Sequence, residues 1–270
     1  MKSSKVLVFW GIILSLIIIM TIFSQFLSPY SPNEMNMDAI YQPPGQDHLL
    51  GTDHLGRDVE SRLLEGGKVT LIVAGSSVLL SLVIGVLYGG ISGYIGGIID
   101  TVMMRFLEAL LTIPSLIIIL AFQMFMKGDI WSMAFIIGIT SWLTTARIVR
   151  SEFIRLKDLE FVKMAKMLGT PIVRILFGHL LRNSIPAIFV VTLFGFANAI
   201  FMEVTLGFLG IGVPPEIPSW GNMLYHAQND ILIGAWWIGL FPGILIFITI
   251  LAINFIGDGL KSPKRRRLDA

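Results

Sequence analysis

The apolar positions of this chain gather into long runs rather than alternating with polar residues. Six runs carry few or no charges, at about 6–27, 69–90, 107–126, 130–149, 185–207 and 231–256. A helix needs about 20 apolar residues to cross the hydrocarbon core of a membrane, so each run predicts one span. The pattern therefore predicts an all-α, polytopic membrane helix bundle with about six transmembrane helices.

Composition agrees with a chain that is surrounded largely by lipid. Of its 270 residues, 54% are hydrophobic and 14% are charged, whereas a soluble domain has about 25% charged residues. The first run follows Lys2 and Lys5, but it is too long for a signal peptide, and residues 24–26 lack a small-x-small cleavage site. We interpret it as a retained anchor helix. The chain has no Cys, which excludes disulfides and thiolate ligands.

The positions of Lys and Arg predict the orientation in the membrane. Basic residues cluster between the fourth and fifth runs and in the tail: Arg150, Arg155, Lys157, Lys163, Lys166, Arg174, Arg182, Lys261, Lys264, Arg265, Arg266 and Arg267. The connection after the fifth run carries Glu216 and Asp230 and no basic residue. Because cytoplasmic loops are rich in Lys and Arg, we expect a multi-pass protein with both termini in the cytoplasm.

Three regions follow from this arrangement. Residues 1–66 hold the anchor helix and an external, mostly irregular segment (28–66) rich in Pro, Asp and Asn. Residues 67–260 form the transmembrane core with a cytoplasmic loop at about 150–185, and 261–270 form a basic tail. Within the core, Gly85, Gly89, Gly93 and Gly97 recur every four residues, which predicts a close helix–helix contact.

A short helix is predicted in the cytoplasmic loop. Asp158 is a typical N-cap, Glu160 suits the first turn, and Gly169 favours a left-handed helix end. An apolar stripe with helical spacing runs along this helix of about three turns: Phe161, Met164, Ala165 and Leu168. We expect the stripe to bury against protein, although a basic amphipathic loop lying on anionic lipid also fits the pattern.

Several of these stretches resemble a known family. Glu160, Ala165 and Gly169, with Ile185-Pro186 further on, are similar to the "EAA" loop of ABC-importer permeases, although Met164 replaces the first of two common alanines. Residues 50–63, 218–224 and 254–260 resemble, in the same order, the C-type permeases of dipeptide, oligopeptide and nickel importers. The resemblance covers nearly the whole chain.

The resemblance implies a fold, a location and a set of partners. It implies a type I ABC-importer permease fold in a bacterial plasma membrane. The implied partners are a second homologous permease subunit, two cytoplasmic ATPase subunits that bind ATP and Mg²⁺, and an extracytoplasmic substrate-binding protein, with no cofactor in this chain and no nucleic acid. It assigns coupling to the ATPases to Glu160, Phe161, Met164, Ala165, Leu168 and Gly169.

Polar residues outside that loop allow more than one interpretation. Asp53, Gly56, Arg57 and Asp58 either order the external mouth, meet the binding protein, or form a local salt-bridge cluster, with Asp58 and Arg62 at helical i, i+4 spacing. Glu203 is the one charged residue of the fifth run. It lines the translocation path or lies near the outer interface, because a charge deep in a membrane is costly.

Other classes of protein fit the sequence poorly. Gly66-Gly67-Lys68 is not a phosphate loop, because Arg62 and Val69 stand where the motif needs Gly and Ser or Thr. No H-E-x-x-H or G-x-S-x-G motif is present, so we expect no catalytic residue and no enzyme activity. The His residues show no closed metal-ligand set, and a channel would leave the short cytoplasmic helix unexplained.

The cargo remains open at this point. His54-Leu55-Gly56 resembles the nickel-type permeases, whereas Pro214-Pro215 and residues 219–222 resemble the peptide type. The sequence is compatible with an importer of di- and oligopeptides, and equally with an importer of nickel, cobalt or metallophores.

Overall fold

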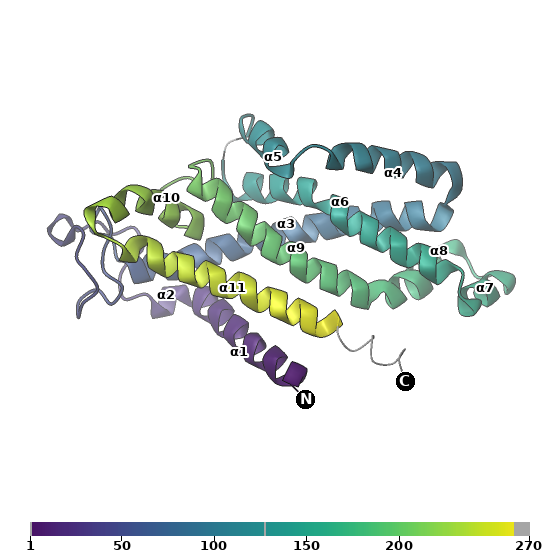
Figure 1. Cartoon of the computed structure of the whole chain (residues 1–270), viewed down its shortest axis with the longest axis horizontal. Coiled ribbons are helices and arrows are strands. Elements are labelled where there is room, and N and C mark those ends of the chain that lie inside the picture. Colours follow the sequence, from purple (N-terminus) through teal and green to yellow (C-terminus); the bar gives the residue numbers. More distant parts are fainter. Residues whose placement is uncertain (1, 127, 262–270) are drawn as a thin grey trace.

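The computed structural model describes residues 2–126 and 128–261, and these residues are almost entirely helical (Figure 1). No strand occurs in these two ranges, apart from an isolated bridge between Thr52 and Asp58. Five helices are long and apolar enough to cross a membrane: α1 (Lys2–Ile22), α3 (Val59–Ile95), α6 (Ile130–Lys157), α9 (Arg182–Phe208) and α11 (Trp237–Lys261). The predicted polytopic helix bundle is confirmed.

The third predicted span is broken. Instead of one helix over 107–126, α4 (Gly97–Leu111) and α5 (Ser115–Gln123) meet at an angle of 77°. Pro114 precedes α5, and proline lacks a backbone N–H and clashes with the preceding turn of a helix, so it favours a break at this point. Counted as one span, the bent pair brings the number of candidate spans within residues 2–126 and 128–261 to six.

Short elements fill the connections between the long helices. They are α2 (Ser24–Leu27), η1 (Met37–Ala39), α7 (Glu160–Met167), α8 (Ile172–Arg174), the π-helix η2 (Ile175–Leu181), α10 (Trp220–Asp230) and η3 (Ile231–Ile233). The external segment was expected to stay irregular to residue 66, but α3 already begins at Val59 because Asp58 caps it. Most of the predicted basic tail, residues 262–270, lies outside the described ranges.

The centre of the bundle is the contact between α3 and α6. Three of the four glycines predicted to line a seam face α6, and a Cβ atom at Gly89 would lie 2.2 Å from the carbonyl oxygen of Ala146. Gly85 and Gly93 are similarly crowded by α6. Gly97 does not belong to the seam, because it begins α4 with a φ of +61° and open space around it.

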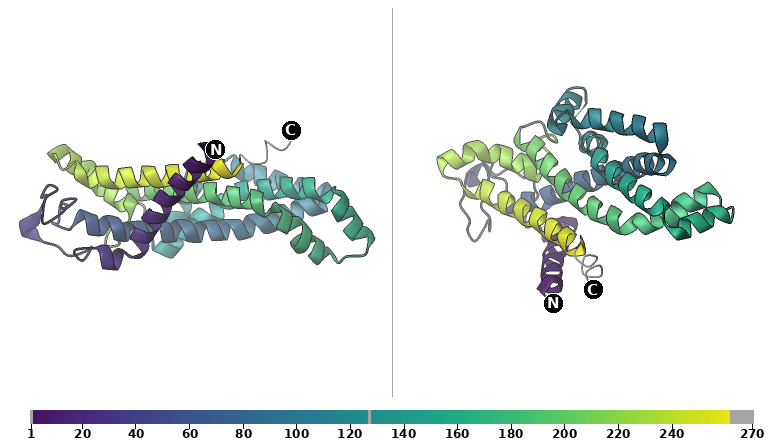
Figure 2. Two further views of the ribbon diagram at one scale, coloured as in Figure 1. Left: turned by 90° about the horizontal axis from the view of Figure 1, so that it is seen from below. Right: turned by 45° about the vertical axis from the view of Figure 1, so that its right-hand side comes forward.

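The start of α1 lies beside the end of α11 (Figures 1 and 2). Trp10 of α1 stacks on Phe255 of α11 with ring centroids 5.0 Å apart. The first and last helices are therefore antiparallel, and both ends of the described chain lie on the same side. We call the end of the bundle that carries α7 the α7 end, and the opposite end, with residues 28–58 and α10, the α10 end (Figure 1).

Candidate functional sites

The helix of the predicted coupling loop, α7, is shorter than expected. It follows Leu159, whose side chain makes no capping hydrogen bond, and it has eight residues rather than three full turns. The predicted N-cap, Asp158, instead lies at the end of α6 with φ −92° and ψ −3°. The capping prediction is wrong because α6 continues to Lys157 and holds Asp158 in a helical conformation, whereas an N-cap needs extended backbone.

The other end of α7 is as predicted. Gly169 adopts a φ of +72°. Its N–H donates to the carbonyl oxygen of Lys166, and the Thr170 N–H donates to that of Ala165, each at 3.0 Å. These two bonds form the Schellman motif that commonly ends helices at a glycine. The left-handed helix end is confirmed.

The apolar stripe of α7 faces away from the chain. Phe161, Met164 and Leu168 are 40%, 61% and 82% exposed, and Ala165 is the one member that is buried. The expectation that the stripe is buried is therefore wrong for this chain by itself. Clustered apolar side chains of this size at the surface are typical of a site that binds another molecule.

Val162 fixes α7 to the bundle, a role that the sequence did not reveal. It is fully buried and belongs to a cluster with Phe153 and Leu156 of α6, and Ile175 and Leu180 of η2. Val162 directly follows Phe161, a member of the predicted stripe, but its side chain faces the bundle. Ile188 of α9 belongs to the same cluster, so α7 is packed against α6, η2 and α9.

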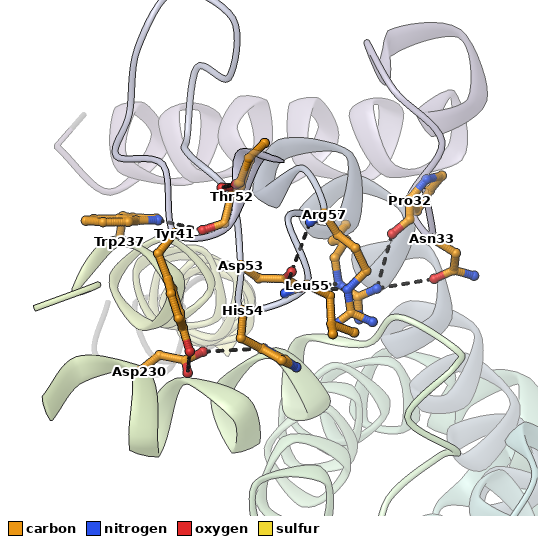
Figure 3. A network of polar contacts seen from close by, with 12 residues as sticks. Pro32, Asn33, Tyr41, Thr52, Asp53, His54, Leu55, Arg57, Asp230 and Trp237 are labelled. Atoms are coloured by element: carbon orange, nitrogen blue, oxygen red, sulfur yellow. Dashed lines mark hydrogen bonds and ion pairs between the residues drawn. The ribbon is translucent and has the colours of Figure 1, made fainter. Parts of the chain in front are cut away.

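At the α10 end, Asp53 organises a buried ion-pair network (Figure 3). Its carboxylate binds Nε of Arg57 at 2.7 Å and lies 3.7 Å from Nε of Arg62. Both guanidinium groups are almost fully buried, and Nη1 of Arg62 also donates to the carbonyl oxygen of Pro32 at 3.1 Å. The side chains of Asp53, Arg57 and Arg62 and the carbonyl group of Pro32 thus hold residues 28–58 to the start of α3.

The expected Asp58–Arg62 pair is not formed. Asp58 is the N-cap of α3, where it accepts from the Ser61 N–H at 2.7 Å, and it pairs with Nδ1 of His48 at 2.9 Å. The capping position turns the carboxylate toward the helix's own N–H groups, while Arg62 turns toward Asp53. Gly56 is also part of this region, with a φ of +68° and its Cα against the backbone of Asn36.

The network extends to α10 and α11. Tyr41 donates to Oδ1 of Asp230 at 2.8 Å, and Nδ1 of His54 lies 3.6 Å from Oδ2 of the same residue (Figure 3). Burial, with Asp230 as the second cause, raises the pKa of Tyr41 to about 12. Nε1 of Trp237 donates to the carbonyl oxygen of Thr52 at 3.0 Å. Residues 28–58 are therefore held to α10 and α11.

His226 of α10 completes this region. Its ring lies 4.8 Å from that of His54, measured between centroids. Burial lowers the pKa of His226, and the neighbouring His54 adds to this effect. Sequence reasoning missed Tyr41, His226 and Asp230, because Tyr41 and Asp230 are 189 positions apart and no local spacing connects them.

Glu203 is fully buried inside the bundle. Its Oε2 accepts from Oγ1 of Thr70 at 2.9 Å, and that same hydroxyl accepts from the backbone N–H of Trp220 at 3.2 Å. The acid thus connects α9 with α3 and with the first residue of α10. Its predicted place on the translocation path stays a prediction, and in this chain its contacts are with protein.

A groove of about 470 Å³ opens between α3, the α4–α5 bend, α6 and α9. Its polar side chains are all uncharged: Ser81, Ser115, Thr140, Ser141, Thr144, Thr145 and Asn198. The other lining residues are apolar or glycine. Within residues 2–126 and 128–261, no three His, Asp or Glu side chains gather as a metal site.

Comparison with known proteins agrees with this architecture. Residues 81–267 match the family model for the inner membrane component of binding-protein-dependent transport systems, and residues 1–44 match the model for the N-terminal TM domain of oligopeptide transport permease C. A putative peptide permease protein of Brucella suis biovar 1 is 41% identical over 86% of this chain and 78% of its own length.

Two relatives from Bacillus subtilis cover almost the whole chain. The dipeptide transport system permease protein DppC is 37% identical over 99% of this chain and 84% of its own length. The oligopeptide transport system permease protein OppC is 35% identical over 98% of this chain and 88% of its own length. These matches confirm the resemblance found in the sequence motifs. The chain therefore belongs to the family of inner membrane components of binding-protein-dependent transport systems.

Proposed function

We propose that this chain is a membrane-spanning permease subunit of an ATP-driven peptide importer. The observation that carries the proposal is the groove, which offers hydroxyl and amide groups but no charged side chain. Such groups can donate to and accept from the backbone of a peptide whatever its side chains are. Relatives named as dipeptide and oligopeptide permeases support the same cargo.

A cargo of free nickel ions has less support. Divalent transition metals favour imidazole and thiolate ligands, and carboxylates suit the harder cations. The groove lining contains none of these side chains, and the reported relatives are named for peptides.

The partners follow from the two ends of the bundle. The α7 end, together with both termini, would face the cytoplasm, where the exposed face of α7 would dock on an ATPase subunit that binds ATP and Mg²⁺. The α10 end would meet an external binding protein, and a second permease subunit would cover the groove. Support comes from the exposed Phe161, Met164 and Leu168 and from the family match.

Uptake by cells with and without this gene tests the cargo. Labelled di- and oligopeptides would be compared with labelled nickel and cobalt, with and without a chelator. Loss of peptide uptake alone supports the proposal. Loss of metal uptake with peptide uptake unchanged would contradict it.

A single substitution tests the docking of α7. Met164→Asp places a charge in the exposed apolar face, and because burying an unpaired charge is costly we expect uptake to fall at least about tenfold. Met164→Leu keeps the apolar volume and should retain uptake. Co-purification with the ATPase subunits should fall only in the Asp variant, and equal co-purification of both variants would count against docking through this face.

A further inference from the structure

The helix α4 packs on the bundle through one apolar cluster, in which Leu107 meets Trp142, Leu143 and Ala146 of α6. It lies along one edge of the molecule (Figure 1), and Leu107 is its one fully buried residue. It begins after Gly96 and at Gly97, which have φ values of +73° and +61°, and it ends at the 77° bend before α5. A conformational joint therefore stands at each end of this 15-residue helix.

The bend at the end of α4 forms one wall of the groove. Leu110, Ile113 and Ser115 line it from this side, while Thr140 and Thr144 of α6 line it from another. Ser81 of α3 and Asn198 of α9 line the remaining sides, so a joint movement of α4 and α6 relative to α3 and α9 would change the shape of the space through which cargo would pass.

One ion pair fixes the start of α4 to α6. Nε and Nη2 of Arg150 donate to Oδ1 and Oδ2 of Asp100 at 2.5 and 2.6 Å. Ser92 also donates to Asp100, and Nζ of Lys157 donates to the carbonyl oxygen of Gly93 at 3.0 Å. Two parallel charge-assisted bonds fix both distance and orientation, and partial burial limits their screening by water.

Arg150 lies close to the coupling loop. It precedes the end of α6 at Lys157 by seven residues, about 10 Å along the helix. After Asp158 and Leu159, α7 begins at Glu160, and Val162 packs against Phe153 and Leu156 of α6. A continuous set of packed contacts therefore runs from α7 through α6 to Arg150, and across the ion pair to α4.

We propose that Arg150 and Asp100 are positioning residues that make α4 follow α6 when the coupling loop moves. This proposal rests on the proposed function, in which partner ATPases displace α7. With the pair intact, movement of α6 carries the α4–α5 bend with it and reshapes the groove. Without the pair, α6 moves while α4 turns at its glycine joint, and ATP is hydrolysed without transport.

The first test uses the complete transporter in proteoliposomes, with its binding protein and labelled dipeptide. In Asp100→Asn and Arg150→Gln, uptake should fall at least about tenfold, while ATPase activity stimulated by the loaded binding protein is retained. The exchange variant Asp100→Arg with Arg150→Asp should recover part of the uptake. Native uptake in both single variants would overturn the proposal.

A matched control comes from α4 itself. Arg105 pairs with Glu108 at 3.4 Å, on the exposed side of the same helix. Arg105→Gln removes an ion pair that joins no two helices, so its uptake should equal that of the native transporter. If the native transporter itself fails to take up peptide, the proposed function fails, and that outcome is separate from an effect of the pair.

A second test measures whether α4 and α6 move together. The chain has no Cys, so Val102→Cys and Ser151→Cys place unique spin labels at exposed positions of α4 and α6. The distance between the two labels should be the same with and without trapped nucleotide. In Asp100→Asn, the distribution of distances should broaden in one of these two nucleotide states. A distance that changes with nucleotide while the pair is intact would overturn the proposal.

Discussion

At the scale of single residues, Gly169 determines how α7 ends. Its φ of +72° lies in the left-handed region, yet a Cβ atom there would meet nothing within 4 Å. A substitution thus changes backbone strain without a steric clash. The conformation costs an L-residue about 1–2 kcal/mol, with asparagine as a tolerated exception.

We therefore expect Gly169→Val to unwind the end of α7 and to lower the amount of peptide imported per ATP hydrolysed. Gly169→Asn occupies the same position and should retain most of this coupling, because asparagine adopts the left-handed conformation readily. Both rates would be measured in proteoliposomes. Equal coupling in the two variants would show that the helix end has no part in transport.

The free energy of unfolding should depend on pH through His226. Burial lowers its pKa in the folded protein, so below about 6.5, the ordinary value for histidine, the unfolded chain binds more protons than the folded one. Stability should then fall as the pH decreases through this range. Because Asp53, Arg57, Arg62 and His54 act on the same ring, the effect belongs to the region where residues 28–58 meet α10.

The check is thermal unfolding of the purified protein at pH 7.5 and 5.5. His226→Gln should reduce the loss of stability at the lower pH, because glutamine does not titrate. An unchanged loss in His226→Gln would contradict this assignment.

At the scale of elements, the α3–α6 contact depends on backbone approach. Gly89→Ala places a methyl group 2.2 Å from the carbonyl oxygen of Ala146, so the two helices must separate. Overpacking of this kind typically costs about 1–3 kcal/mol. Gly75→Ala, on the same helix, meets only Phe196 at 3.7 Å. In detergent, we expect the unfolding temperature to be lower for Gly89→Ala and unchanged for Gly75→Ala.

Apolar run length predicted the long helices because crossing a membrane requires it, whatever the packing. The break before α5 was not predictable in the same way. Pro186 and Pro242 lie inside α9 and α11, so proline in an apolar run does not by itself determine whether a span bends. Packing of neighbouring helices decides the outcome, and that information is not local.

The candidate sites show the same difference between features that depend on local sequence and features that depend on tertiary packing. The left-handed end at Gly169 was predicted because it depends on one residue and the turn before it. The partners of Asp58 and Arg62 were assigned wrongly, because i, i+4 spacing does not say which side chain belongs to a helix cap. Tyr41 and Asp230 meet only through tertiary folding, so no sequence spacing could have paired them.

At the scale of the whole molecule, the features described are distributed along its length. Exposed apolar side chains stand on α7, an uncharged groove lies beside the middle of α6 and α9, and a buried ion-pair network orders the α10 end. α6 connects the first two of these regions, since it lines the groove and leads into α7. A chain that converts movement at one end into access at the other would need this continuity.

The most direct test is ATP-dependent uptake by the purified transporter in proteoliposomes, with ATP inside and a loaded binding protein outside. We predict that labelled dipeptide accumulates only when ATP and this chain are both present, and that labelled nickel does not accumulate. Accumulation of nickel without peptide, or peptide entry that is independent of ATP, would contradict the assignment of this chain to an ATP-driven peptide importer.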